Sequence, residues 1–305
     1  MKYAFLFPGQ GAQCIGMGKD FYEQFDVAKA VFEKANALLG FDLTKIIFEG
    51  PIETLTQTKY SQVAIFVVSM AILEVIKTRM QKPHFVAGLS LGEYSALVAG
   101  GWLGFDEGLQ LVWKRGGLMH EACDAKKGGL TVILGLDEKE IKDVVAKAHL
   151  PHDLWMANLN CPKQVVLSGS PKGLDVGIKL ALEKGAKKAI PLNVHGAFHS
   201  GMMQSAEKKL NAYLETLDFK KGYADIVMNT TGQMTHTIEE IKRNLKCQMT
   251  TPVYWQKGIE TMDSKVDMFI EIGCGKVLSG LNRRIGTKAK TINVETVEDL
   301  KKGSI

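Results

Sequence analysis

The positions of apolar and polar residues along the chain predict short strands that alternate with longer helices. The apolar runs that are typical of buried strands lie at 2–7, 84–87, 225–229 and 266–272. The segments that have the character of helices lie at 20–39, 61–80, 106–121 and 277–285, and Asp106 is expected to cap the third. Strands that alternate with helices in this way indicate an α/β layer structure.

Residues 125–194 follow a different order of elements. The strands that the pattern predicts here lie at 130–136, 154–160, 164–168 and 189–194. A capping box that begins at Asp137 and a proline after Ser170 start the two helices between them. The order βαββαβ over about 65 residues is the ferredoxin-like unit. We therefore predict a small ferredoxin-like domain, 125–194, inserted into a large domain made of 1–124 and 195–305.

The stretch Gly88-Leu89-Ser90-Leu91-Gly92 joins the strand at 84–87 to a helix at 94–99. A strand, Gly-x-Ser-x-Gly and a helix form the context of a nucleophile elbow. The serine of such a turn has a strained backbone, and the residues two before and two after it crowd each other, which requires the two glycines. Ser90 would be exposed, and the N–H of Leu91 would face an oxyanion. The alternative is a glycine-rich turn whose serine has no chemical role.

Composition places the chain among ordinary globular proteins, with 305 residues, 46% hydrophobic and 23% charged. The five cysteines are odd in number and form no Cys-x-x-Cys pair, which predicts reduced thiols and a cytoplasmic location. The N-terminal apolar run is too short for a signal peptide, and the apolar stretch 63–73 is too short to span a bilayer. We expect no membrane segment.

The net charge of +5 is weak evidence about the partners of the protein. The lysines are scattered in pairs, and nothing resembles a nucleic-acid-binding module, so we expect no nucleic acid partner. A mild positive excess suits an anionic substrate or an acidic protein partner.

Seven histidines are available as a base for the serine. His199 is favoured because it lies in a loop just before a helix, where catalytic bases usually lie in such folds. The pairs His149/His152 and His195/His199 lack regular ligand spacing, and no carboxylate completes them, so we expect no metal.

Two further features stay open on the residues alone. The loop Pro8–Gln13 carries two glycines around Gln10, which would aim backbone N–H groups at an anion, but a plain turn fits equally well. Arg115 lies inside the helix 106–121 beside two glycines. It is either a site residue or a solvated surface residue.

Taken together and in order, seven motifs make the chain resemble the malonyl-CoA:acyl carrier protein transacylases, of the acyltransferase family of fatty-acid and polyketide synthesis. The match runs nearly end to end. The motifs are Phe7-Pro8-Gly9-Gln10-Gly11-Ala12-Gln13, Gly88-Leu89-Ser90-Leu91-Gly92-Glu93-Tyr94-Ser95-Ala96-Leu97, Arg115-Gly116 with Met119, Asn158-Leu159-Asn160-Cys161-Pro162-Lys163-Gln164, Ala197-Phe198-His199-Ser200, Gln248 ahead of Pro252-Val253 and Trp255, and Glu271-Ile272-Gly273 with Gly275-Lys276-Val277-Leu278.

The resemblance implies roles for these positions. Ser90 would be the nucleophile and His199 its base, and the N–H groups of Gln10 and Leu91 would form the oxyanion hole. The main-chain carbonyl of Gln248 would orient the histidine in place of a triad carboxylate.

The substrate would be held by further residues. Arg115 would pair with the malonyl carboxylate, which suits the bidentate fork of arginine. Gln164, Asn160 and Phe198 would line the site. The resemblance implies a large α/β-hydrolase-like domain with the site in the groove under the ferredoxin-like domain. It implies no cofactor, with malonyl-CoA as substrate and phosphopantetheine carried by an acidic acyl carrier protein.

One position departs from the family, which usually has histidine where this chain has Leu89. Related acyltransferase domains with phenylalanine at the position of Phe198 tend to choose malonyl over methylmalonyl, because the ring would crowd an α-methyl branch.

Two alternative functions remain. One is a serine thioesterase or esterase, whose elbow type places Asp or Glu and then His after the serine. The other is a carrier-docking subunit without chemistry. We expect a monomer.

Overall fold

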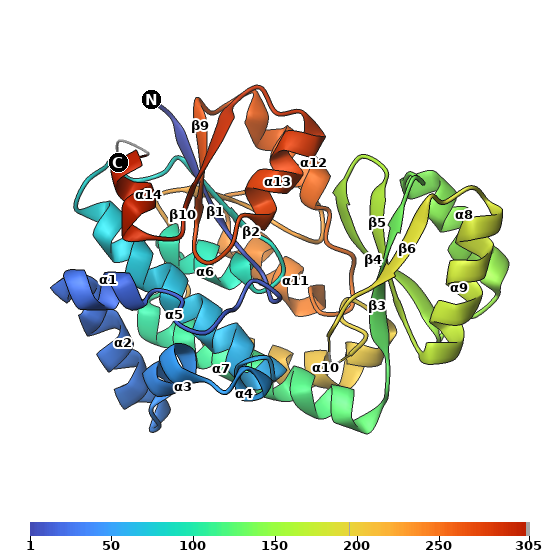
Figure 1. The fold of residues 1–305 in the computed structure, drawn as a ribbon, viewed down its shortest axis with the longest axis horizontal. Coiled ribbons are helices and arrows are strands. Elements are labelled where there is room, and N and C mark those ends of the chain that lie inside the picture. The colour runs from blue at the N-terminus through green and yellow to red at the C-terminus, as the bar shows by residue number, and fades with distance from the viewer. Residues whose placement is uncertain (195, 303–305) are drawn as a thin grey trace.

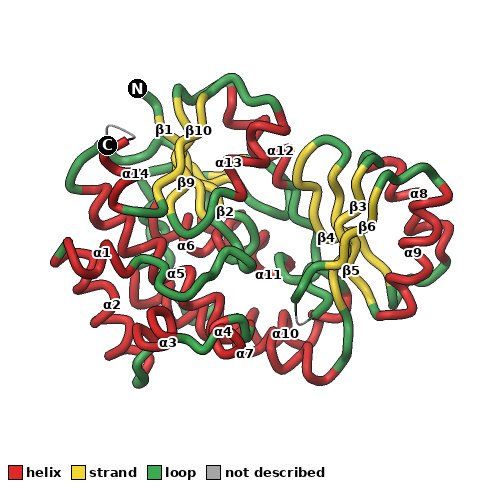
Figure 2. Tube along the Cα trace, viewed as in Figure 1, coloured by secondary structure: helices red, strands yellow, loops and turns green. Residues whose placement is uncertain are grey.

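A computed structural model describes residues 1–194 and 196–302, and two β-sheets organise them (Figure 1). The strands of the large sheet are β1 (Tyr3–Phe7), β2 (Phe85–Gly88), β7 (Asp225–Val227), β8 (Met234–Thr235), β9 (Met268–Ile272) and β10 (Lys290–Val294), in the order β10-β9-β1-β2-β7-β8. The strands of the small sheet are β3 (Gly129–Leu134), β4 (Leu154–Cys161), β5 (Gln164–Gly169) and β6 (Lys188–Pro191), in the order β4-β5-β3-β6. Figure 2 shows them as two separate groups.

The helices lie around these sheets. Those of the large part are α1 (Lys19–Gln24), α2 (Asp26–Leu39), α3 (Leu43–Glu49), α4 (Ile52–Leu55), α5 (Thr58–Lys77), α6 (Gly92–Ala99), α7 (Phe105–Ala125), the 3₁₀ helix η1 (Gly201–Met203), α10 (Gln204–Leu214), α11 (Ile238–Cys247), α12 (Trp255–Asp263), α13 (Val277–Ile285) and α14 (Val297–Lys302). Those of the small part are α8 (Glu138–Ala148) and α9 (Pro171–Glu183). The predicted α/β class with a second, antiparallel sheet is confirmed.

The large sheet is parallel except for β8, and both of its faces are buried. Successive side chains of β1 point to opposite faces. Phe5 and Phe7 pack into the core that contains α5, whereas Ala4 and Leu6 pack into the core formed with α12 and α13. A parallel sheet covered on both faces explains why its strands are continuous apolar runs in the sequence.

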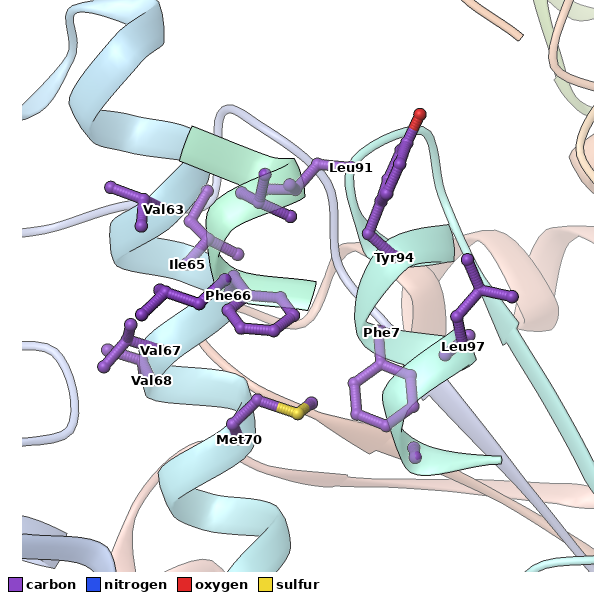
Figure 3. Packing of buried hydrophobic residues seen from close by; sticks show 14 of the residues in the cluster. Phe7, Val63, Ile65, Phe66, Val67, Val68, Met70, Leu91, Tyr94 and Leu97 are labelled. Atoms are coloured by element: carbon purple, nitrogen blue, oxygen red, sulfur yellow. The ribbon is translucent and has the colours of Figure 1, made fainter. Parts of the chain in front are cut away.

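Helix α5 forms the centre of the first core. Figure 3 shows Phe66 and Met70 of α5 pointing toward Phe7, with Tyr94 and Leu97 of α6 beside them. α5 is the one helix in the described part of the chain that is long and apolar enough to cross a membrane, and 83% of its most apolar stretch is buried inside the protein. It therefore has the character of a core helix.

The ferredoxin-like unit is present with the predicted βαββαβ order. The capping box at Asp137 forms as expected, and Ser170 caps α9 with proline at its first position. In Figure 1, α8 and α9 cover one face of the small sheet, and the other face is turned toward the large part. The limits 125 and 194 remain a prediction, and residue 195 lies outside the described residues.

Some sequence expectations about helices are wrong. The helix predicted at 20–39 is two helices, because Phe25 has extended backbone angles (φ −134°, ψ 116°) between α1 and α2. Asp106 is not a cap, since α7 starts one residue earlier after Gly104, and its carboxylate pairs with Lys34 instead. The elements α3, α4, α12, α14, β8 and β10 were not predicted.

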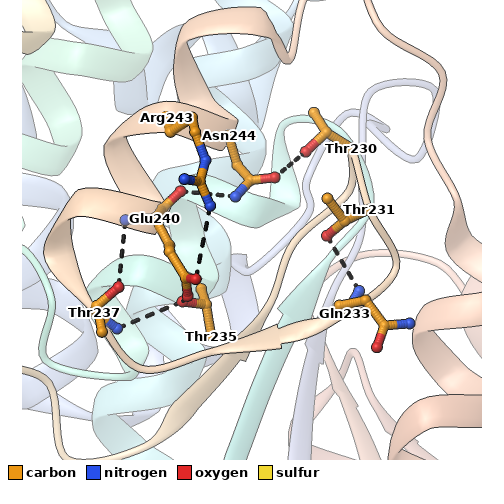
Figure 4. Close-up of polar contacts among 8 residues, drawn as sticks. All are labelled: Thr230, Thr231, Gln233, Thr235, Thr237, Glu240, Arg243 and Asn244. Atoms are coloured by element: carbon orange, nitrogen blue, oxygen red, sulfur yellow. Dashed lines mark hydrogen bonds and ion pairs between the residues drawn. The ribbon is translucent and has the colours of Figure 1, made fainter.

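The turn that connects β7 to α11 is fixed by its own polar side chains (Figure 4). Thr237 caps α11 by accepting a hydrogen bond from the Glu240 N–H, but the Glu240 carboxylate accepts from the Thr235 hydroxyl instead of completing a capping box. Thr230 bonds the side chain of Asn244, which in turn donates to the carbonyl of Glu240. Thr230, three residues after the end of β7, is therefore anchored to α11.

Candidate active site

The carboxyl ends of three neighbouring strands bring the candidate residues together. Gln10 follows β1, Ser90 follows β2 and Asn229 follows β7, and these strands are adjacent and parallel. Ligands of open parallel sheets bind at this edge. The order of the strands thus explains how Ser90 and Asn229, which are 139 positions apart in the sequence, come into contact.

The predicted elbow is present between β2 and α6. Ser90 has a left-handed backbone conformation, with φ of 54°. A Cβ atom on Gly88 would lie 1.9 Å from the carbonyl carbon of Gly92, which is the crowding that the sequence predicted. A Cβ atom on Gly92 would instead lie 2.0 Å from the carbonyl oxygen of Phe7, so this glycine is required by the end of β1.

We expect Gly88→Ala to lower the free energy of unfolding by about 3 kcal/mol or more, because its methyl group would collide with backbone that has nowhere to move. Gly117→Ala is the matched control, since its Cβ would meet nothing within 4 Å in the interior of α7. There we expect a gain of about 0.5–1 kcal/mol. Urea unfolding of both variants measures the contrast, and equal stability of the two would contradict this account of the elbow.

His199 faces the serine. Its Nε2 atom lies 2.8 Å from the Ser90 Oγ. Its Nδ1 atom lies 2.9 Å from the carbonyl oxygen of Gln248 and 3.1 Å from that of Thr251. Carbonyl oxygens only accept, so the proton is on Nδ1, and the Nε2 lone pair is free to take the proton of the serine hydroxyl.

The environment of His199 keeps the imidazole neutral. The side chain is 3% exposed, and burial lowers its pKa to about 4, with the nearby positive charge of Arg115 acting in the same direction. The hydrogen bonds to the two carbonyl groups raise the pKa of His199, but by less than burial and Arg115 lower it. A neutral imidazole at physiological pH is the form that acts as a base.

We expect the reactivity of Ser90 toward a neutral fluorophosphonate probe to rise with pH around about 4 and to be constant above about pH 5.5, because only neutral His199 accepts the proton. Arg115→Gln removes a positive charge that lowers this pKa, so the midpoint should move upward. Rates measured after brief pH jumps test both statements. A wild-type midpoint near 6.5, or one that Arg115→Gln leaves in place, would contradict them.

Arg115 projects from α7 to the same point and is fully buried. Its Nη2 lies 3.2 Å from the Ser90 Oγ and 3.0 Å from the Oε1 of Gln248, and its Nη1 lies 2.6 Å from the Oε1 of Gln62. The guanidinium also lies over the ring of Tyr94, at 5.1 Å from the centroid. Burial lowers its pKa, but an arginine keeps its charge. The surface alternative for Arg115 is therefore wrong.

A buried network of side chains supports these groups. Glu93 accepts hydrogen bonds from the Gln248 side chain at 2.7 Å and from the Asn229 N–H at 2.6 Å, and burial raises its pKa to about 7. Asn229 accepts from the Ser90 N–H at 2.7 Å and donates to the Gly88 carbonyl at 2.7 Å, so it holds both sides of the elbow.

No role was predicted for Gln62, Glu93 or Asn229, and for Gln248 only the main-chain carbonyl was expected to take part. A signal existed for each of the three. Gln62 is a polar residue at the start of an apolar helix, Glu93 is a charge in the apolar helix after the elbow, and Asn229 follows a strand that ends beside β2.

A cavity of about 250 Å³ opens in front of Ser90, between the two sheets. Its lining includes Asn160, Gln164 and Phe198, which were predicted to line the site. It also includes Leu89, an apolar side chain at the position where the family usually has histidine. Other apolar residues of the small sheet and of α13 complete the wall. The lining is Gln10, Gln62, Leu89, Ser90, Met119, Leu130, Val132, Asn158, Asn160, Gln164, Val166, Leu192, Val194, Phe198, His199, Val277 and Leu281.

The resemblance assigned the backbone N–H groups of two residues to the oxyanion hole. Gln10 lies in the loop after β1, and Leu91 is the residue before the first turn of α6. Neither N–H donates a hydrogen bond to another described residue. Neither N–H is therefore committed to a described acceptor, and the oxyanion hole stays a prediction.

The site has groups that suit acyl transfer: a nucleophile and a base in the cavity lining, and a buried cation 3.2 Å from the nucleophile. Within residues 1–194 and 196–302, His, Cys, Asp and Glu side chains form no group of three or more that would hold a metal. His195, one half of the histidine pair considered as ligands, lies outside the described residues.

Comparisons with known proteins agree over the whole length of the chain. Residues 4–302 match the family described as acyl transferase domain. The malonyl CoA-acyl carrier protein transacylase of Bacillus subtilis is 45% identical over 302 residues, which is 97% of this chain and 95% of that protein. The crystal structure of the transacylase of the same name from Clostridium perfringens has a TM-score of 0.95 at 37% identity, covering 100% of this chain and 96% of that one.

A third relative was solved as a complex of a type II PKS acyl-carrier protein with its malonyl-transacylase. It has a TM-score of 0.94 at 34% identity and covers 99% of this chain and 98% of that one. The matched family spans both sheets and every element of the candidate site. The chain belongs to the acyl transferase family.

Proposed function

We propose that this protein transfers a malonyl group from malonyl-CoA to the phosphopantetheine thiol of an acyl carrier protein, through an ester on Ser90. This supplies chain-extender units for fatty-acid synthesis. The observation that carries the proposal is the fully buried guanidinium of Arg115, whose Nη2 lies 3.2 Å from the nucleophile. A buried cation beside the reacting atom suits an acyl group that carries a carboxylate of its own.

In the first half-reaction, Ser90 Oγ attacks the thioester carbonyl while its proton moves to Nε2 of His199. The N–H groups of Gln10 and Leu91 stabilise the oxyanion, a contribution of about 10²–10³ in rate for each donor. The C–S bond then breaks, and His199 returns the proton to the sulfur of CoA. The malonyl ester on Ser90 remains, with its carboxylate against Arg115.

The second half-reaction reverses these steps with a different thiol. The carrier's phosphopantetheine thiol gives its proton to His199 and attacks the ester carbonyl. The C–O bond to Ser90 breaks, and the serine oxygen takes the proton back. Malonyl is now a thioester on the carrier, and the enzyme has returned to its starting state.

The hydrolase alternative is weaker. An esterase of this elbow type places a carboxylate behind the histidine, whereas both described partners of the His199 Nδ1 are main-chain carbonyls. Product analysis discriminates the two functions. With malonyl-CoA alone we expect one malonyl per enzyme and little free malonate. With a pantetheine thiol added we expect malonyl thioester at a much higher rate. Equal release of malonate with and without the thiol would support the hydrolase.

The carrier is expected to be acidic and to dock on basic residues of the two elements that flank the cavity. Lys187 and Lys188 lie at the start of β6, Arg283 and Arg284 lie at the end of α13, and all four are exposed. Arg284 donates to the Oε1 of Gln164 at 2.5 Å, so it bridges the two parts of the molecule. This placement supports docking across the open end of the cavity, where Val277 is 54% exposed.

Charge reversal of Lys188 and Arg283 to Glu should slow transfer to the carrier about tenfold or more at low salt and spare acylation by malonyl-CoA, because only the protein substrate loses its steering charges. Lys220→Glu with Lys221→Glu is the control of equal charge, placed just before β7 at the amino-terminal edge of the sheet. Stopped-flow transfer rates with purified carrier measure the effect. An equal loss in both half-reactions, or in the control, would refute this docking surface.

We also propose a monomeric, cytoplasmic enzyme that requires no cofactor of its own. The five cysteines are all free thiols, which supports a reducing compartment. The acyl chemistry described above uses side chains and backbone groups of the protein itself. Light scattering at working concentration tests the monomer.

A further inference from the structure

Glu93 brings a carboxylate into the interior of the large part, where it lies in the first turn of α6. Its side chain is fully buried, and each carboxylate oxygen accepts one hydrogen bond from an N–H group. The main-chain nitrogen of Asn229 lies 2.6 Å from Oε1, and the Nε2 of Gln248 lies 2.7 Å from Oε2. Both partners donate at these contacts, so the ionised carboxylate, which only accepts, is the form that fits this position.

A buried anion is unfavourable without a cation nearby, and Arg115 is the cation that the structure provides. It is the one buried lysine or arginine side chain in the described residues, and His199 beside it is kept neutral by burial, with a pKa of about 4. Burial raises the pKa of Glu93 to about 7, while the positive charge of Arg115 acts to lower it. The other fully buried carboxylate in the described part of the chain, Glu271, accepts its hydrogen bonds from the start of α13. Glu93 is therefore the buried anion that interacts with Arg115.

The two charges are joined by one neutral carboxamide instead of a direct ion pair. The Oε1 of Gln248 accepts from the Nη2 of Arg115 at 3.0 Å, and its Nε2 donates to Glu93. A guanidinium only donates and a carboxylate only accepts, so the amide has a single orientation between them. The same Nη2 lies 3.2 Å from the Ser90 Oγ. The anion is thus close enough to stabilise the cation, but it does not cover the side of the guanidinium that faces the nucleophile.

We infer that Glu93 is the counter-ion of Arg115 and is held one carboxamide away, so that the buried guanidinium keeps both its charge and its access to a carboxylate on the acyl group. The inference rests on the proposed function, which supplies that carboxylate. Glu93 touches no reacting atom, so it is a positioning residue. A bound carboxylate and Glu93 would attract the same cation and repel each other. Removing the charge of Glu93 should therefore strengthen the binding of a carboxylate at Arg115, whereas mere damage to the site should weaken it.

The first experiment uses malonate as the probe and measures the concentration that half-protects Ser90 from a neutral fluorophosphonate at pH 8, where the carboxylate of Glu93 is ionised. For Glu93→Gln we expect half-protection at an about tenfold lower malonate concentration, because one nearby negative charge is gone. Glu93→Asp is the matched control, since it shortens the side chain but keeps the charge, and there we expect half-protection at the wild-type concentration or above it. Protection should disappear in Arg115→Gln, because the cation that binds malonate is gone.

The second experiment needs no ligand and compares the urea unfolding of Glu93→Gln, Arg115→Gln and the double variant at pH 8. Each single change leaves a buried charge without its partner, so we expect the unfolding midpoint to fall by about 1 M. The double change leaves no unpaired charge, so its midpoint should be no lower than that of Glu93→Gln. Glu271→Gln is the matched control, because it removes an equally buried carboxylate that shares no described hydrogen-bond partner with Arg115. Combined with Arg115→Gln, it should show the sum of the two single losses.

Two results would overturn the inference. One is a Glu93→Gln enzyme that binds malonate no more tightly than Glu93→Asp does. The other is a double variant whose losses add up as they do in the control pair. If Glu93→Gln does not fold alone, folding of the double variant supports the inference, and its failure to fold overturns it. A wild-type enzyme that takes up no malonyl from malonyl-CoA refutes the proposed function, and the unfolding comparison then still decides whether the two charges act as a pair.

Discussion

Ser90→Ala should abolish the malonyl-enzyme and lower transfer to a thiol by about 10⁴–10⁶, since loss of a nucleophile removes the covalent route altogether. The free energy of unfolding should change little, because alanine has the same left-handed strain at this φ as serine. Affinity for malonyl-CoA should stay within about threefold of wild type, because the Arg115 fork keeps its two carboxamide partners. Quench-flow measures the transfer rate, urea unfolding measures the stability, and calorimetric titration measures the affinity.

Ser95→Ala is the matched control for that experiment. Ser95 lies five residues further on in α6, is fully buried, and its hydroxyl has no hydrogen-bond partner among the described residues. Removing it should leave transfer unchanged. Transfer by Ser90→Ala at more than about a hundredth of the wild-type rate would show that another group does the chemistry.

His199→Ala should slow acylation of Ser90 by about 10²–10⁴, the usual contribution of a positioned base. The rise in rate near pH 4 should vanish as well, because the group that titrates there is gone. Added imidazole should restore part of the rate, since the substitution leaves a space of imidazole size beside the nucleophile. The measurement is the acylation rate after brief pH jumps to about pH 3–8, a range that spans the expected midpoint, with and without imidazole.

His84→Ala separates this effect from a general loss of histidine. His84 is exposed and precedes β2, at the edge of the sheet opposite the elbow. It should behave as wild type at every pH. An unchanged acid limb in His199→Ala would assign the titration to a different group and contradict the role of the base.

The fold was predictable wherever local pattern and packing agree. The β1 and β2 runs are apolar because both faces of the parallel sheet are buried, and the capping box at Asp137 forms without help from distant residues. Prediction failed where tertiary contacts decide. The backbone at Phe25 breaks a continuous amphipathic pattern, and β10 carries exposed and half-buried residues that hide its strand character.

The site was predictable only in part, for the same reason. Ser90, His199 and Arg115 lie in motifs with local sequence signatures, and the structure brings His199 and Arg115 each within hydrogen-bond reach of Ser90. Asn229 meets Ser90 across 139 residues, and Gln62 meets Arg115 across 53. No local pattern encodes such pairs, because they follow from the order of strands in the sheet and from the packing of α5 on α7.

The most direct test is to digest the enzyme after brief exposure to malonyl-CoA, identify the modified peptide by mass, and repeat the digestion after adding a pantetheine thiol. The account predicts one malonyl group, on Ser90, which leaves when the thiol is added and is recovered as malonyl thioester. Malonyl found on a different residue, or on none while product still forms, would contradict it.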